Sequence, residues 1–345
     1  MPVTVIVGGQ FGSEGKGKVA HALAQSKCAR LAVRVGGPNS GHTVIDLGGN
    51  ALILRQLPTA AILPDVICVL GAGSYIDPDI LLKEMEETRL RSDCLRVDPN
   101  AAVITEREKQ EEASTTLKQA IGSTLSGTGA AVGRRIARVR ALRLAKDEPR
   151  LRPFITPVPL LLRQQLDAGE RLILEGTQGF GLSVLHAPDY PYVTSRDTTA
   201  AAFISEAGVS PLDVDDVVLV IRAFPIRVGG NSGPLQNEFD WQTLSSESGC
   251  KSLIQEYTSV TRSLRRVARF DPELVKQAIA VNAPTHIALN HLDYVDYSCH
   301  NLHRPSARAI EFVEAIESAI STKIDYWGLG PASLVSRQPA GGSRE

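Results

Sequence analysis

The stretch that decides the fold is GGQFGSEGKGK, residues 8 to 18. It follows an apolar run, Val3–Val7, that predicts a strand, and it leads into Val19–Ala24, which predicts a helix. A strand, a glycine-rich loop and a helix in this order are typical of a phosphate-binding loop. Backbone N–H groups at the start of such a helix point toward an anion, and Lys16 adds a positive charge. The sequence therefore predicts a nucleotide site here.

The loop differs from the usual Walker A pattern. Five residues, not four, separate Gly9 from Gly15, and Gly17 stands where a serine or threonine would bind Mg²⁺. A simple tight turn explains such a loop about as well. The assignment therefore depends on other motifs in the chain.

Composition limits the class of protein. The chain has 345 residues, 43% of them hydrophobic, and a net charge of −1, which gives no electrostatic reason to expect nucleic-acid or membrane binding. Five scattered cysteines fit reduced thiols and show no metal-ligand spacing. The start, MPVTVIVGG, lacks the basic region and cleavage site of a signal peptide. We therefore expect a cytoplasmic protein.

Strand-like and helix-like segments alternate along the chain. This order predicts an α/β fold, with one large domain over residues 1–337, a mostly parallel central sheet flanked by helices, and a P-loop-like nucleotide site. A β-hairpin extension is expected over Thr43–Gln56, and residues 338–345 form a polar tail. The expected strands are Val3–Val7, Leu31–Val35, Ile67–Leu70, Leu172–Leu174, Val217–Ile221 and His286–Leu289. The expected helices are Asp79–Arg91, Glu106–Gln119, Arg134–Leu144, Leu160–Ala168, Thr198–Ala207, Pro272–Val281 and Ser306–Ile320.

Two groups of polar residues have ordinary structural interpretations. The charged run Glu106–Glu112 is typical of a solvated helix face. His186, His300 and His303 are more typical of surface or hydrogen-bonded histidines than of metal ligands.

A second loop, RVGGPNSGHT at Arg34–Thr43, gives the first loop a context. Together the two loops resemble the adenylosuccinate synthetase family, and the resemblance runs through nearly the whole chain. Further matching motifs are STLSGTG (Ser123–Gly129), EGTQG (Glu175–Gly179), YPYVTSRDTTA (Tyr190–Ala200), RVGGNSGP (Arg227–Pro234), Pro272–Asp293 and GLGP (Gly328–Pro331).

The resemblance implies a two-step ligase reaction. A nucleoside triphosphate phosphorylates O6 of a 6-oxopurine nucleotide, and the amine of L-aspartate then displaces that phosphate. It implies that Lys16 stabilises the transferring phosphoryl group and that His42 contacts the β and γ phosphates. Mg²⁺ is the implied metal, with Ser13 and the carbonyl of Gly41 at its ligand positions. The residues implied for the triphosphate are Gly12, Glu14, Gly15, Lys16, Gly17, Gly41, His42, Thr43, Asn290, Asp293, Gly328 and Gly330.

The same resemblance implies a purine monophosphate site. Its residues are Ser13, Asn39, Ser123, Thr124, Arg138, Gln178, Leu182, Thr194 and Val228. Arg138 matches an arginine that reaches the nucleotide of the other subunit, which implies a homodimer. The sequence around Arg138 matches the family motif less well, and a surface arginine on a helix is the alternative interpretation.

Aspartate is expected at the loop TSVTRSLRR, residues 258 to 266. The implied residues are Thr258, Ser259, Val260, Thr261 and Arg265, and a guanidinium fork suits a carboxylate. Ser263 departs from the family pattern, which has an arginine there, near the ribose. Arg262 is a candidate to compensate for that arginine.

The base of the triphosphate is recognised in the family by a Lys-x-Asp element. Here the element is His291-Leu292-Asp293, so the aspartate is kept and the lysine is lost. Gly328 also replaces a family serine. These changes favour ATP or dATP as the phosphoryl donor, with GTP as the alternative.

Ser13 is the most important departure, because the family has an aspartate there that carries the acid–base chemistry. A smaller side chain leaves room for the 2-amino group of guanine, and serine with Ser263 resembles a phage-type branch of the family. That branch converts dGMP and L-aspartate to N6-succinyl-2-amino-2′-deoxyadenylate, a precursor of diaminopurine DNA. Serine cannot remove the N1 proton at neutral pH. Two other interpretations remain open, an ordinary IMP-using synthetase and an inactive nucleotide-binding protein.

Overall fold

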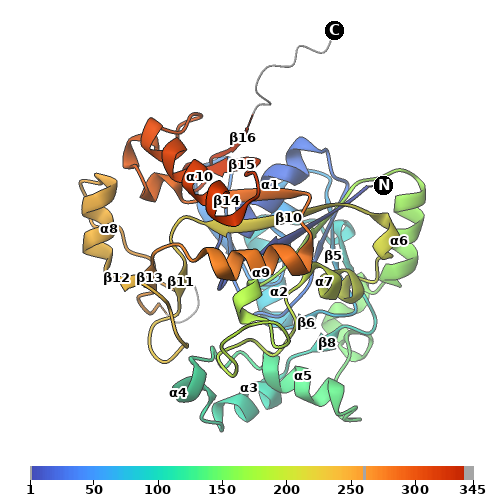
Figure 1. Ribbon diagram of the computed structural model, residues 1–345. Helices are drawn as coiled ribbons and strands as arrows, with labels where there is room; N and C mark the ends of the chain where they lie inside the picture. Colours follow the sequence, from blue (N-terminus) through green and yellow to red (C-terminus); the bar gives the residue numbers. More distant parts are fainter. Residues whose placement is uncertain (1, 259–261, 338–345) are drawn as a thin grey trace.

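A nine-stranded sheet forms the centre of the molecule (Figure 1). The computed structural model describes residues 2–258 and 262–337. The strand order is β16-β15-β14-β10-β1-β9-β2-β5-β7, and each pair is parallel except β15 with β16. The bounds are β1 Val3–Gly8, β2 Leu31–Arg34, β5 Ile67–Leu70, β7 Leu95–Val97, β9 Leu172–Glu175, β10 Val214–Arg222, β14 His286–Asn290, β15 Tyr326–Gly328 and β16 Leu334–Ser336. The predicted α/β class and mostly parallel sheet are confirmed.

Strand β1 lies in the middle because both of its faces are apolar. Val5 and Val7 pack on one side with Phe203, while Ile6 packs on the other side with Val19 of helix α1 (Lys16–Ser26). Alternate side chains of a strand point to opposite faces, so helices can cover both faces of the sheet. This placement fixes the end of β1, and hence the glycine-rich loop, at the carboxyl edge of the sheet.

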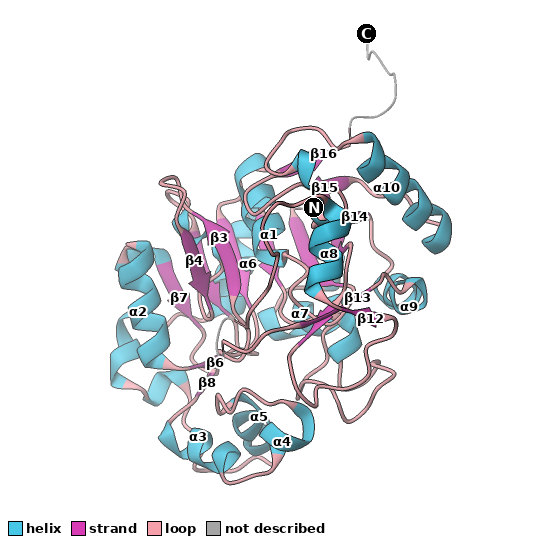
Figure 2. Ribbon diagram, turned by 90° about the vertical axis from the view of Figure 1, so that its left-hand side faces the viewer, coloured by secondary structure: helices cyan, strands magenta, loops and turns pink. Residues whose placement is uncertain are grey.

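Ten α-helices surround the sheet among the described residues (Figures 1 and 2). Helices α3, α4 and α5 gather at one end of the molecule in both views. The bounds are α1 Lys16–Ser26, α2 Pro78–Thr88, α3 Glu106–Ala113, α4 Leu117–Ile121, α5 Thr128–Ile136, α6 Val158–Asp167, α7 Ala200–Ala207, α8 Trp241–Ser248, α9 Pro272–Asn282 and α10 Ala307–Ile320. No described helix is long and apolar enough to cross a membrane.

The predicted hairpin is present as β3 (His42–Ile45) and β4 (Ala51–Leu54), an antiparallel pair. The Asp46 carboxylate forms its turn by accepting from the backbone N–H groups of Gly48 and Asn50, at 2.9 and 2.8 Å. Two short sheets complete the fold. They are β6 (Tyr75–Ile76) with β8 (Ala102–Val103), and β11 (Ile226–Arg227) with β13 (Arg266–Ala268) and β12 (Glu238–Phe239).

Three predictions around the α3–α5 segment were wrong. The single helix expected over Glu106–Gln119 is two helices, α3 and α4, separated by a turn at residues 114–116. The helix expected over Arg134–Leu144 is instead α5, which ends at Ile136, and turns follow it. The helix begins earlier because the Glu112 carboxylate accepts from the N–H groups of Gly127 and Ala130 at its start. For the same reason Glu112 is buried, so the run Glu106–Glu112 is not simply a solvated face.

Candidate active site

Two adjoining cavities open beside the loop that follows β1. Four residues line both of them, namely Ser13, Gly41, His42 and Arg265. The larger cavity has a volume of about 590 Å³, within the range of ligand sites. We call the smaller one the purine cavity and the larger one the donor cavity. Atoms bound in the two cavities would meet at the four shared residues.

The glycine-rich loop is folded around the side chain of Glu14. This carboxylate is fully buried and accepts from the backbone N–H groups of Gln10 and Gly12, at 3.1 and 2.8 Å. Gly15, with φ of 88°, precedes the first residue of α1 in a conformation that glycine adopts without strain. The side chain of Glu14, predicted to contact the triphosphate, therefore holds the loop from within.

Lys16 is also turned inward. Its Nζ lies 2.6 Å from Glu14 Oε2, and its side chain is 2% exposed. Lys16 still lines the donor cavity, as do Gly15, Gly17, Gly41 and Thr43. An incoming phosphate would compete with Glu14 for the ammonium group.

His42 is positioned by Glu175, a residue on β9. The Nδ1 of His42 bonds Glu175 Oε1, and the other carboxylate oxygen accepts from the N–H of Thr59 at 2.7 Å. Burial first, and then the charge of Arg34, lower the pKa of His42 to about 4. Burial alone would raise the pKa of Glu175, but the hydrogen bond from His42 and the charges of His42 and Arg34 lower it to about 2. At neutral pH, therefore, the imidazole is neutral and its Nδ1–H faces an ionised carboxylate, which leaves Nε2 unprotonated.

Ser13 is exposed at the junction of the cavities, in the left-handed backbone region with φ of 59°. Its hydroxyl accepts from the guanidinium of Arg265, and its backbone carbonyl accepts from Arg222 at 2.9 Å. Arg222 is fully buried and pairs with Glu256, whose pKa falls to about 2 because the Arg222 charge outweighs the effect of burial. The guanidinium groups of Arg265 and Arg222 therefore outnumber the one carboxylate, Glu256, in this group of contacts around Ser13.

Most residues expected at the monophosphate do line the purine cavity. They are Ser13, Asn39, Thr124, Gln178, Leu182 and Val228, together with Thr258 and Arg265 from the aspartate loop. Ser123 and Thr194 lie next to lining residues but do not line the cavity themselves, and Thr194 donates its N–H to the Leu182 carbonyl at 2.8 Å. Within residues 2–258 and 262–337, no aspartate or glutamate lines this cavity.

Arg138 lies apart from both cavities. It is exposed just beyond α5, with φ of 55°. Three residues expected at aspartate, Ser259, Val260 and Thr261, lie outside the described residues.

Asp293 and Gly330, both expected at the triphosphate, line the donor cavity. Two residues expected there lie underneath the loop instead. Asn290 is fully buried and donates to the Glu14 carbonyl at 2.7 Å, and a side-chain carbon at Gly328 would lie 1.9 Å from Asn290 Oδ1. Neither lines the cavity, so both support the loop rather than face a ligand.

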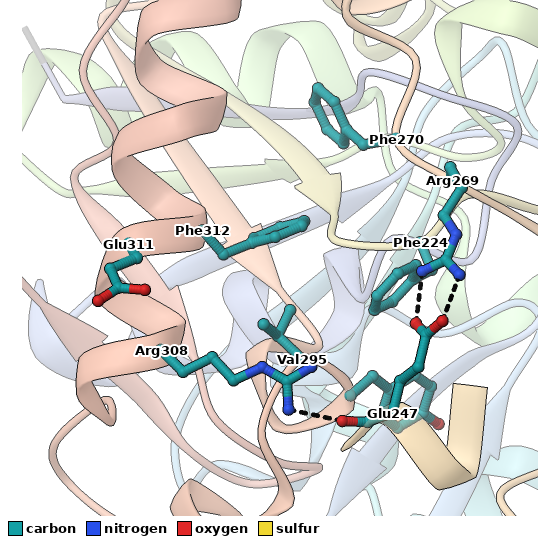
Figure 3. Close-up of a pocket in the computed structure, with 9 residues that line it drawn as sticks. Phe224, Glu247, Arg269, Phe270, Val295, Arg308, Glu311 and Phe312 are labelled. Atoms are coloured by element: carbon teal, nitrogen blue, oxygen red, sulfur yellow. Dashed lines mark hydrogen bonds and ion pairs between the residues drawn. The ribbon is translucent and has the colours of Figure 1, made fainter. Parts of the chain in front are cut away.

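A third hollow, of about 420 Å³, is lined by Phe224 and Phe312, among other residues (Figure 3). A Glu247–Arg269 ion pair with two bonds of 2.6 Å lines one side of it. It shares only Tyr294 with the donor cavity and holds none of the expected site residues.

Comparison with known proteins identifies the family. The model of the adenylosuccinate synthetase family matches residues 5–148 and 143–300. The adenylosuccinate synthetases of Archaeoglobus fulgidus and Methanocaldococcus jannaschii are 36% and 38% identical to this chain, over 96% and 95% of it and 96% and 94% of their own lengths. The chain belongs to the adenylosuccinate synthetase family. It is therefore a member of a family of carbon–nitrogen ligases that bind nucleotides in purine synthesis.

Two solved structures of the family share the fold. The succinoaminodeoxyadenylate synthetase of cyanophage S-2L, bound to dGMP and dATP, is 34% identical, with a TM-score of 0.80 over 96% of this chain and 93% of that one. The fully ligated adenylosuccinate synthetase of Plasmodium falciparum superposes with a TM-score of 0.82 over 98% and 100% of the two chains, at 21% identity. The second likeness shows the fold alone.

The family uses a nucleoside triphosphate with Mg²⁺. The described residues hold no group of three or more histidine, cysteine, aspartate or glutamate side chains that could bind a metal alone. The two ligands expected from the sequence, the Ser13 hydroxyl and the Gly41 carbonyl, belong to residues that line the junction, and both are neutral oxygens. This set fits a Mg²⁺ that is held mostly by phosphate oxygens and water.

Several residues that shape the site were not predicted from the sequence motifs. Glu175 orients His42, the Arg222–Glu256 pair supports Ser13, and His300 lines the donor cavity. Glu175 was visible within the EGTQG motif, but the other three carry no local pattern. Their roles come from contacts between residues 34 or more positions apart, or from a turn after β14.

Proposed function

We propose that this protein joins L-aspartate to C6 of dGMP, with ATP or dATP as the phosphoryl donor, to form N6-succinyl-2-amino-2′-deoxyadenylate for diaminopurine nucleotide synthesis. The observation that carries the proposal is the purine cavity, in which Ser13 stands at the junction and no described carboxylate lines the wall. Hypoxanthine and guanine both carry an N1–H that must be removed, so it is the space beside N1, and not the missing carboxylate as a base, that favours guanine. A cavity with a hydroxyl there instead of a carboxylate suits a base that carries a 2-amino group beside N1.

The geometry supports phosphoryl transfer at the junction. His42 and Gly41 line both cavities, so a γ-phosphate in the donor cavity can approach O6 of a purine in the other. Lys16 and the loop N–H groups would hold phosphate oxygens, and Mg²⁺ bound with the triphosphate would neutralise their charge. The purine N1 proton leaves in this step. Serine cannot take it at neutral pH, so we propose that water, phosphate or another group of the site accepts that proton.

The second step replaces the new phosphate. The aspartate amine forms a bond to C6, and the C6–O6 bond breaks, releasing inorganic phosphate and a proton from nitrogen. Arg265 lines the junction and has a guanidinium that can bind an aspartate carboxylate. Its position allows it to hold the amine near C6.

Two other functions remain as alternatives. Ordinary adenylosuccinate synthesis from IMP and GTP has the support of archaeal relatives at 36% to 38% identity. An inactive nucleotide-binding protein has little support, because Lys16, His42, Gln178 and Arg265 are all kept around one junction. Identity does not separate the first two, since the dGMP-bound phage enzyme is 34% identical.

Subunit assembly is a further part of the proposal. Arg138 is exposed and away from this chain's own cavities, so it is free to reach a nucleotide held by a second copy. We propose a homodimer on this ground, acting in the cytoplasm.

The decisive experiment compares monophosphates in parallel. The purified protein is incubated with L-aspartate, Mg²⁺ and either dGMP, GMP, IMP or dIMP, each with ATP, dATP or GTP, and products are measured by mass spectrometry. We expect succinylated product chiefly from dGMP. Equal or better turnover of IMP would make the protein an ordinary synthetase, and no product from any combination would favour the inactive alternative.

A further inference from the structure

Asp293 lines the donor cavity, and its two carboxylate oxygens have different surroundings. Its side chain is only 2% exposed. Oδ2 lies 2.7 Å from Nδ1 of His300. Oδ1 is buried and has no hydrogen-bond partner among the described residues. Because a buried carboxylate oxygen without a donor is costly, Oδ1 is an acceptor that awaits a ligand.

His300 is fixed in the orientation that produces this asymmetry. Its ring stacks on Tyr297, with the ring centroids 4.6 Å apart and the ring planes at 11° to each other. Both residues line the donor cavity together with Asp293. Nδ1–H donates to the carboxylate, so the imidazole occupies Oδ2 before any ligand arrives.

We propose that His300 determines the base specificity of the triphosphate site, by leaving Asp293 a single free oxygen for a base that offers one N–H group at that edge. The inference rests on the proposed assignment of this cavity to the phosphoryl donor. The 6-amino group of adenine can donate one hydrogen bond to Oδ1. Guanine presents N1–H and a 2-amino group side by side, and this pair is matched by a carboxylate with both oxygens free.

The neighbouring ammonium group of Lys18 does not make the surroundings of the two Asp293 oxygens alike. Lys18 Nζ donates to the Gly330 carbonyl at 2.8 Å, and no ion pair joins it to Asp293 among the described residues. The guanine edge would therefore place one of its two N–H groups against an oxygen already bonded to His300. That N–H must share Oδ2 with His300, and the weaker bond that a shared oxygen offers lowers the affinity for GTP.

The test is calorimetric binding of ATP, dATP and GTP with Mg²⁺, without monophosphate or aspartate, so that no turnover occurs. The wild-type protein should bind ATP and dATP about fivefold or more tightly than GTP. His300→Ala frees Oδ2, so GTP should bind more tightly and the ratio should fall by about fivefold or more. His300→Asn keeps an N–H near the Nδ1 position and should restore the wild-type ratio. His303→Ala, which changes an exposed histidine outside the cavity, is the matched control and should leave the ratio unchanged.

Three results would overturn the inference. They are a wild-type protein that binds GTP as tightly as ATP, a His300→Ala protein with the wild-type ratio, and a His300→Asn protein that behaves like the alanine variant. Failure of the proposed function has a different signature. Preferred turnover of IMP would reject dGMP as substrate and leave the binding ratio intact, whereas a protein that binds no triphosphate would overturn both.

Discussion

The guanidinium of Arg265 donates a hydrogen bond to the hydroxyl of Ser13, although the two residues are 252 positions apart in the chain. A guanidinium only donates, so the Ser13 oxygen is the acceptor and its own proton is free for another partner. This contact joins the loop expected to hold aspartate to the residue expected to face the purine. Ser13 can therefore donate to a ligand acceptor such as O6, and the Arg265 contact gives it no means of removing the N1 proton.

Ser13→Asp should reduce turnover of dGMP by more than tenfold. A carboxylate there would crowd the guanine 2-amino group, and it would form a charge-assisted pair with Arg265 that competes with the aspartate substrate. The initial rates with dGMP and IMP, each at several aspartate concentrations, measure both effects. We expect KM for aspartate to rise and activity on IMP to increase.

The control for this variant is Ser92→Asp, which adds the same charge at an exposed site away from both cavities. It should retain the wild-type rate on dGMP. If Ser13→Asp also retains that rate, Ser13 does not face the base and the dGMP proposal loses its main support.

Lys16 and His42 should affect the rate more than the affinity for dGMP, because they act where phosphoryl charge develops. Lys16→Gln and His42→Ala should each lower kcat by roughly a hundredfold or more. Glutamine is chosen for Lys16 because a neutral donor can still bond the buried Glu14, whereas alanine would leave that charge without its cation. Calorimetric titration with dGMP should give affinities near wild type. Near-normal kcat with weakened dGMP binding would contradict the assignment of these loops to phosphoryl transfer.

Much of the central sheet was predictable because its strands are short apolar runs. Val3–Val7 and Leu31–Val35 stand out in the sequence since parallel strands are buried on both faces. Helix α8 was not predicted, because its sequence WQTLSSES is mostly polar. It is fixed instead by Asp240, which accepts from the N–H of Thr243 at 2.6 Å. Its apolar side chains, Trp241 and Leu244, pack into the core only through tertiary contacts.

The sequence predicted the loop residues that line the cavities, but it did not predict the buried residues that hold those loops in place. Residues such as Asn39 and Gln178 lie in short motifs and do line the purine cavity. Asn290 also lies in a matching segment, yet it supports the loop by bonding the Glu14 carbonyl. Whether a motif residue faces a ligand or the protein depends on side-chain direction. That direction is set by packing between distant segments and has no local sequence signal.

Acid should destabilise the protein partly through His42. Its pKa is about 4 in the folded protein, below the ordinary value of 6.5. Between these values the unfolded chain binds more protons, so stability falls as pH drops from about 6.5 toward about 4. By pH 5 this histidine alone should account for a loss of about 2 kcal/mol.

Urea unfolding of the wild-type protein and of His42→Gln, near neutral pH and near pH 5, measures this contribution. Glutamine does not titrate and can still donate to Glu175, so the variant should lose less stability on acidification. His303→Gln removes an exposed histidine and should lose as much as the wild type. An equal acid response in His42→Gln would show that His42 does not change its pKa on folding.

Gly328→Ala should weaken the support of the phosphate-binding loop. The new methyl group would lie 1.9 Å from Asn290 Oδ1 and 2.5 Å from Lys18 Nζ, so Asn290 must move away from the Glu14 carbonyl that it bonds. Overpacking of this kind costs about 1 to 3 kcal/mol. The midpoint of thermal unfolding should fall, and KM for the triphosphate should rise because the loop loses its support. Gly133→Ala is the matched control, since that glycine lies inside α5 with open space around its Cβ position and should gain up to about 1 kcal/mol from better helix propensity. A Gly328→Ala protein as stable as wild type, with an unchanged KM, would mean that Asn290 does not hold the loop.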